Sequence, residues 1–145
     1  MGQMGHVGRV GRAPGGGLVG LVAIVLFHLA ISIVHGQAHS GAHVALSPAA
    51  AAFVYIVILA GPLVGLALLR WRADVGSWIV AASLGGALVF GLVNHFIIPG
   101  ADRVDQVAAE WRGLFSATAA LLLASEGAGV VMGVWTARRV VRRTS

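Results

Sequence analysis

The chain has 145 residues, of which 58% are hydrophobic and only 10% are charged, against about 25% charged in an average soluble domain. With a mean hydropathy of +0.89, this composition excludes an ordinary water-covered domain and predicts an all-α integral membrane protein that crosses the cell membrane several times. The net charge of +5 does not indicate a nucleic-acid partner, because the arginines flank hydrophobic runs, and the absence of cysteine excludes disulfides and thiolate metal sites.

The hydrophobic runs predict one membrane domain, residues 18–137, built as a bundle of four transmembrane helices. Residues 1–17 are rich in glycine and are expected to form a disordered cytoplasmic N-terminus, and residues 138–145 an arginine-rich cytoplasmic tail. The expected spans are 18–38, 49–69, 78–98 and 114–135, with a short amphipathic helix over 101–112 on the outer surface.

Local signals mark the second span. Ser47 and Pro48 are typical of an N-cap followed by the first helical residue. Pro62, directly after Gly61, is expected to kink or loosen the helix in its interior. Gly61 and Gly65 form a small-xxx-small pair, which predicts close contact with another helix.

The arginines predict the orientation. Eight of the ten lie with the N-terminus, the connection over 70–75 and the C-terminus, and only Arg103 and Arg112 lie with the other two connections. Positive charge is retained on the cytoplasmic side, so both termini are expected in the cytoplasm. An alternative is a signal peptide that is cleaved after Ala38, although the apolar run is longer than usual for one.

The most distinctive stretch of the chain carries four of its six histidines, His28, His35, His39 and His43. Their spacings of 7, 4 and 4 keep all four side chains on one narrow face of a helix. Such a stripe is rare in a transmembrane segment, because each polar group in hydrocarbon needs a partner.

A metal site is the leading interpretation of the outer part of this stripe. His35 and His39 are an i, i+4 pair, the spacing with which helices chelate a metal ion, and His95 falls at a matching depth near the end of the third span. Three imidazoles, with His43 as a peripheral ligand, would suit Zn²⁺, Cu²⁺ or Fe²⁺. The expected outer partners are Asn94, Asp102 and Asp105.

Haem b is a variant of the same interpretation. Membrane cytochromes hold haem between histidines on facing helices, and His35 with His95 could do so here. Either cofactor would support redox chemistry or metal handling, and the sequence does not decide whether the protein is an enzyme.

A second polar pair is expected near the middle of the membrane. His28 and Glu126 lie at similar depths in antiparallel spans, so we expect a hydrogen bond between them that serves as a proton relay or pins the two helices together. Two other functions therefore stay open: a proton-coupled carrier that uses this pair, and a non-catalytic accessory or assembly subunit of a larger membrane complex or homo-oligomer.

Overall fold

The computed structural model describes residues 15–144. Residues 1–14 of the N-terminal segment that was expected to be disordered lie outside the described residues. The described residues contain no strand. Their helices are α1 (Gly15–Gly41), α2 (Pro48–Phe53), the π-helix η1 (Val54–Ala60), α3 (Gly61–Leu68), α4 (Ala73–Leu92), the π-helix η2 (Val93–Ile97) and α5 (Ala109–Thr144).

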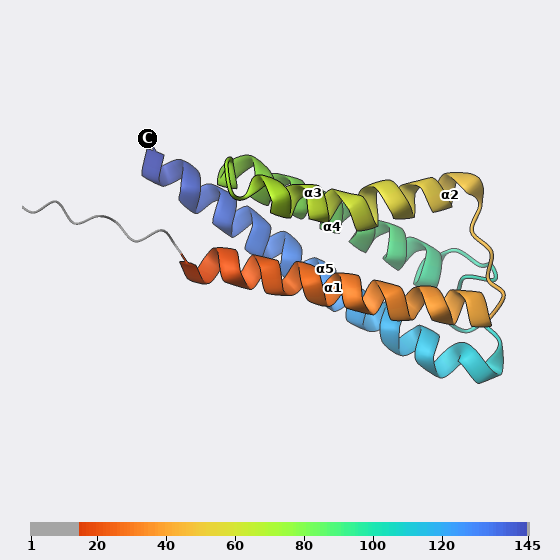
Figure 1. The fold of residues 1–145 in the computed structure, drawn as a ribbon. Helices are drawn as coiled ribbons and strands as arrows, with labels where there is room; N and C mark the ends of the chain where they lie inside the picture. The colour runs from red at the N-terminus through yellow and green to blue at the C-terminus, as the bar shows by residue number, and fades with distance from the viewer. Residues whose placement is uncertain (1–14, 145) are drawn as a thin grey trace, which may run out of the picture.

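These elements form four rods that lie side by side (Figure 1), which confirms the all-α, four-helix prediction. Each rod is long and apolar enough to cross a membrane, and the second combines α2, η1 and α3 while the third combines α4 and η2. The start of α1, the turn between α3 and α4 and the end of α5 share one end of the bundle (Figure 1), and the other two connections share the opposite end.

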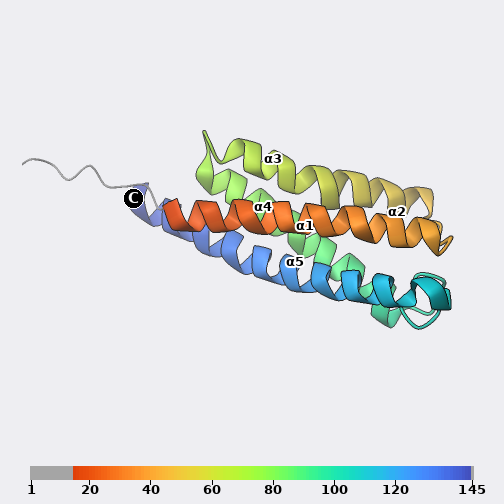
Figure 2. The ribbon, with the colours of Figure 1, turned by 60° about the horizontal axis from the view of Figure 1, so that its bottom comes forward.

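Helix α5 packs along both α1 and α4, and α3 packs along α4. Helix α1 touches the second rod at only a few residues, although the two lie alongside one another in the view of Figure 2. The space between these two rods is therefore where the bundle is least closed.

The start of the second rod follows its local sequence. The Ser47 hydroxyl accepts a hydrogen bond of 3.2 Å from the N–H of Ala50, and Pro48 takes the first helical position, as predicted. The loosening expected at Pro62 is present as the π-helix η1, which ends just before it. Pro62 has no N–H to donate to the carbonyl of Ile58, four residues earlier.

Glycines allow the second and third rods to approach closely. A Cβ atom added at Gly65 would lie 2.9 Å from the carbonyl oxygen of Gly76 and 2.6 Å from a methyl group of Val80. Gly61 faces Ser83 in the same way. The small-xxx-small pair is thus a contact surface for α4, as its spacing predicted.

The prediction of a separate surface helix over 101–112 is wrong. Residues 101–108 form turns, and α5 already begins at Ala109. One hydrogen bond folds this connection back onto η2, since the N–H of Val104 donates to the carbonyl of His95 at 3.0 Å. A second, from the Gly100 N–H to Oε1 of Gln106 at 3.1 Å, closes the connection on itself. At the other end of the chain, the expected tail continues α5 as far as Thr144.

Candidate metal centre

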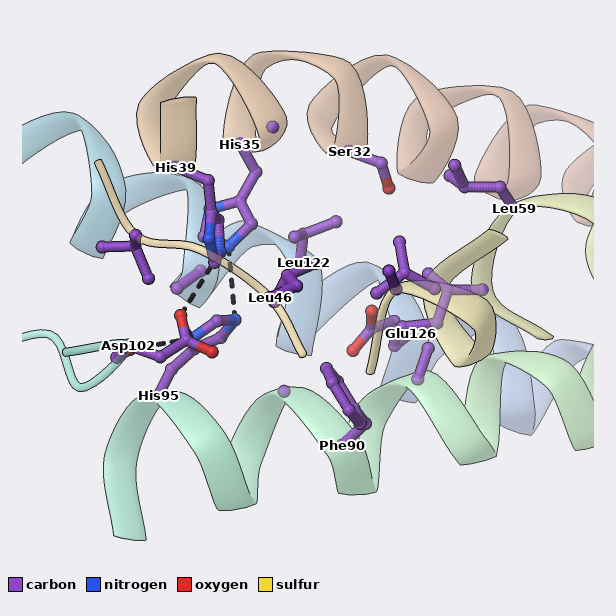
Figure 3. A pocket seen from close by; sticks show the side chains of 18 of the residues that line it. Ser32, His35, His39, Leu46, Leu59, Phe90, His95, Asp102, Leu122 and Glu126 are labelled. Carbon is purple, nitrogen blue, oxygen red and sulfur yellow. Dashed lines mark hydrogen bonds and ion pairs between the residues drawn. The ribbon is translucent and has the colours of Figure 1, made fainter. Parts of the chain in front are cut away.

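His35, His39 and His95 converge at the end of the bundle that carries the 42–47 and 98–108 connections (Figure 3). One ring nitrogen from each lies within 4.8 Å of the others, so the three could hold a metal ion. His35 and His95 are buried, whereas His39 is partly exposed. The predicted proximity of these three residues on two different rods is confirmed.

Thr118 on α5 determines which ring nitrogen of His35 carries the hydrogen. Its hydroxyl lies 2.8 Å from Nδ1 of His35, but it donates its hydrogen to main-chain carbonyls of its own helix, with the Leu114 oxygen at 2.7 Å and the Phe115 oxygen at 3.0 Å. The hydroxyl can therefore only accept from His35, so Nδ1 carries the hydrogen. The Nε2 atom of His35 is left with a lone pair.

Asp102 determines which ring nitrogen of His95 carries the hydrogen. Nδ1 of His95 donates to the main-chain carbonyl of Asp102 at 3.1 Å and lies equally close, at 3.1 Å, to the carboxylate oxygen Oδ1. Both atoms are acceptors, so this Nδ1 also carries a hydrogen. The π-helix η2 and the folded-back connection bring the two residues together.

The two remaining nitrogens face each other. Nε2 of His35 lies 3.2 Å from Nε2 of His95, and both present lone pairs when the rings are neutral. Two acceptors at this distance repel unless a cation lies between them, either a shared proton or a metal ion. Ligand nitrogens at 2.0–2.1 Å from a tetrahedral ion are about 3.3 Å apart, so the observed gap fits a shared ion.

The third histidine completes a compact cluster. Nε2 of His39 lies 3.3 Å from Oδ1 of Asp102, so one carboxylate faces both His39 and His95. The buried ring of Phe115 packs against all three imidazoles, with centroid distances of 4.7 Å to His35, 4.8 Å to His39 and 5.2 Å to His95. Phe115 restricts the rings to this arrangement.

Three residues expected at the site are elsewhere. Helix α1 ends at Gly41, so His43 leaves the helical stripe; it has a positive φ of 55° and is exposed. Asn94 donates to the carbonyl of Phe90 on its own rod at 2.8 Å. Asp105 accepts two hydrogen bonds from Arg103, which lower the pKa of its carboxyl, and its side chain is mostly exposed.

Thr118 and Phe115 were not expected at the site. Threonine and phenylalanine are common in membrane helices, so neither residue type gives a signal. Their positions do give a signal, because both residues lie on α5 within one helical turn of each other, at the end of the bundle where the histidines were expected.

His28 and Glu126 also lie close together, but the hydrogen bond predicted between them is not formed. Nδ1 of His28 is 3.7 Å from Oε1 of Glu126, which is too long for a hydrogen bond. Both side chains are almost completely buried, and neither Nδ1 of His28 nor Oε2 of Glu126 has a hydrogen-bond partner among the described residues.

A cavity of about 380 Å³ extends from the histidine cluster to Glu126. The three histidines and Asp102 line one end of it, and Glu126 lines the other (Figure 3). Its walls between these ends are mostly apolar, with Phe90 and Leu122 among the lining side chains.

The fold and the cluster define the class: a small bundle of four apolar helices, long enough to span a membrane, with three close histidines that could hold a metal ion. Comparison with known proteins adds no family, because no family model, curated protein or solved structure matches the chain.

Proposed function

We propose that this protein is a multi-pass membrane protein that binds one divalent transition-metal ion through His35, His39 and His95. The carboxylate of Asp102 would act as the fourth ligand or as the partner that holds the imidazoles. The observation that carries the proposal is the gap of 3.2 Å between the Nε2 atoms of His35 and His95, which would present lone pairs to one another when both rings are neutral.

The donor set indicates the kind of metal. Imidazole nitrogens with a carboxylate suit Zn²⁺, Cu²⁺ and Fe²⁺, and the cluster contains no thiolate or thioether that would favour Cu⁺. Haem b fits less well, because axial nitrogens on opposite faces of a porphyrin are about 4 Å apart with the macrocycle between them. Here the two Nε2 atoms are closer than that, and Phe115 packs against both rings.

We further propose that the cluster takes its ion from the outer side of the cell membrane. The arginine distribution supports cytoplasmic termini, and the cluster lies at the end of the bundle away from them. The His39 and Asp102 side chains keep 14% and 22% of their exposure, so water and ions reach this end. Such a site is suited to collecting an ion from the outer compartment.

The test is metal analysis of the full chain, purified in detergent without chelator. We expect Zn²⁺ or Cu²⁺ to bind to the wild type with micromolar or tighter affinity. His95→Ala should weaken this binding at least 100-fold, because a ligand is lost and His35 is left without its counterpart. His43→Ala is the matched control, since it removes an exposed histidine outside the cluster, and it should bind as the wild type does.

A wild-type protein that binds no metal, or a His95→Ala variant that binds normally, would overturn the proposal. The accessory-subunit hypothesis would then take its place, and it predicts a stable partner that co-purifies with the chain whether or not His35 and His95 are present.

A further inference from the structure

We propose a second metal-ion site beside the inner end of the cavity, formed by the carboxylate of Glu126, which lines the cavity, and by Nδ1 of His28, which lies 3.7 Å from Oε1 of Glu126. It would take the same divalent ion as the outer cluster, so the inference rests on the proposed function. The site lies seven residues from His35 along α1, which is about 10 Å deeper in the bundle.

The orientation of His28 is fixed by two acceptors. Its Nε2 lies 3.4 Å from the carbonyl of Ile58 and 3.5 Å from the hydroxyl of Ser32. The Ser32 hydroxyl donates its hydrogen to the main-chain carbonyl of His28 at 2.8 Å, so toward the ring it can only accept. Nε2 therefore carries the hydrogen, and Nδ1 presents a lone pair to Glu126.

Pro62 makes this arrangement available. In a regular α-helix the carbonyl of Ile58 would accept a hydrogen bond from residue 62, but proline has no N–H. The carbonyl of Ile58 faces His28 from the second rod, at the place where that rod contains the π-helix η1. A helix irregularity and a buried histidine occur together at this depth, as they do at η2 and His95.

The geometry between His28 and Glu126 suits a shared ion better than a direct contact. The distance of 3.7 Å from Nδ1 to Oε1 exceeds a hydrogen bond but is close to the roughly 3.3 Å between two ligand atoms of one tetrahedral ion. A lone pair and a carboxylate both attract a cation. Oε2 of Glu126 is buried without a hydrogen-bond partner in the part of the chain that the structure describes, and Glu126 lines the cavity, so this oxygen is available as a further ligand.

The cavity supplies the remaining coordination positions and the route. At about 380 Å³ the cavity has room for water molecules beside Glu126, which would complete the coordination of an ion bound by only two side chains. The carboxylate cancels half of the divalent charge. The histidine cluster lines one end of the cavity and Glu126 lines the other, so an ion that enters at the cluster can move inward to Glu126 and the neighbouring His28.

Equilibrium dialysis against Zn²⁺, followed by elemental analysis of the purified full chain, tests the inference. We expect two ions per wild-type chain and one per chain in Glu126→Gln, whose side chain has the same shape. His28→Asn provides a second test should Glu126→Gln fail to fold, and it should also bind one ion. Glu110→Gln, an exposed carboxyl on the same helix, and His43→Ala are the controls and should keep two.

The outcomes separate the two proposals. One ion in the wild type, lost in His95→Ala but kept in Glu126→Gln, would overturn the inner site and leave the outer one standing, with a proton alone held between His28 and Glu126. No bound ion in the wild type would overturn both. A second ion that is lost in Glu110→Gln or His43→Ala would assign it to the surface and would also overturn the inner site.

Discussion

Thr118 and His35 lie 83 residues apart in the chain, yet the hydroxyl of Thr118 accepts a hydrogen bond of 2.8 Å from Nδ1 of His35. This contact joins α5 to α1 and decides which nitrogen of His35 is available to a metal ion. The outer partner of a metal-binding histidine fixes its tautomer and orientation, and its loss typically weakens metal binding 10–100-fold.

We therefore expect Thr118→Val, which keeps the shape and removes the hydroxyl, to weaken Zn²⁺ binding roughly 10–100-fold. Thr118→Ser keeps the hydroxyl and should stay within about threefold of the wild type. Competition titrations with a chromogenic chelator measure both affinities. Equal affinities for the two variants would show that the hydrogen bond does not orient His35.

Asp102 provides a second test, because its main-chain carbonyl and its carboxylate make separate contacts with the histidines. Asp102→Asn keeps the main-chain carbonyl that accepts from His95 and removes only the negative charge that faces His39 and His95. We expect metal affinity to fall about tenfold or more. Asp105→Asn is the matched control, since that carboxylate is paired with Arg103 and is mostly exposed, and it should bind normally.

The opposed lone pairs of His35 and His95 predict that metal binding displaces a proton. Without a metal, a proton shared between the two Nε2 atoms relieves their repulsion, so a proton and the ion compete for one position. Affinity should therefore fall as the pH falls, by up to about tenfold per pH unit for each displaced proton. Calorimetric titrations with Zn²⁺ in two buffers of different ionisation enthalpy measure the release directly, and identical heats in both buffers would contradict it.

The close approach of α3 and α4 predicts a large effect on stability from one methyl group. Gly65→Ala would place a Cβ atom 2.6 Å from Val80 and 2.9 Å from the carbonyl of Gly76, so the helices must move apart. Overpacking of this kind costs about 1–3 kcal/mol of unfolding free energy. Gly113→Ala, in α5 with nothing near its added methyl, should be neutral or slightly stabilising in the same detergent unfolding measurement.

The absence of cysteine makes the membrane orientation easy to test. Single cysteines can be introduced by Ala101→Cys, in the connection before α5, and by Ser145→Cys at the C-terminus. If both termini lie in the cytoplasm, as the arginine distribution predicts, a membrane-impermeant maleimide added to intact cells should label the first variant only. The second should react after permeabilisation, and the reverse pattern would overturn the orientation.

Much of the bundle and part of the site could be predicted from the sequence. Apolar runs of spanning length gave the four rods, and helical spacing combined with matched depth gave the proximity of His35, His39 and His95. Asp102 was expected as an outer partner and does face the cluster. These predictions depend on periodicity and distance along a helix, which a sequence contains directly.

The errors concern places where the chain leaves regular helix geometry. His43 continues the i, i+4 spacing on paper, but α1 ends two residues before it. The 101–112 segment is polar enough for a surface helix, yet its main chain is used to tie the connection to His95. The role of Thr118 was missed because it depends on a contact with another helix, which no local pattern encodes.

The π-helix η2 makes the site sensitive to chain length as well as to residue identity. A π-turn contains one residue more than the α-turn that it replaces, so deleting Val93 would restore ordinary helix geometry and rotate His95 by roughly 100°. Every imidazole would remain in the gene product, but His95 would no longer face His35. The spatial cluster of three histidines therefore depends on one additional residue in the third rod.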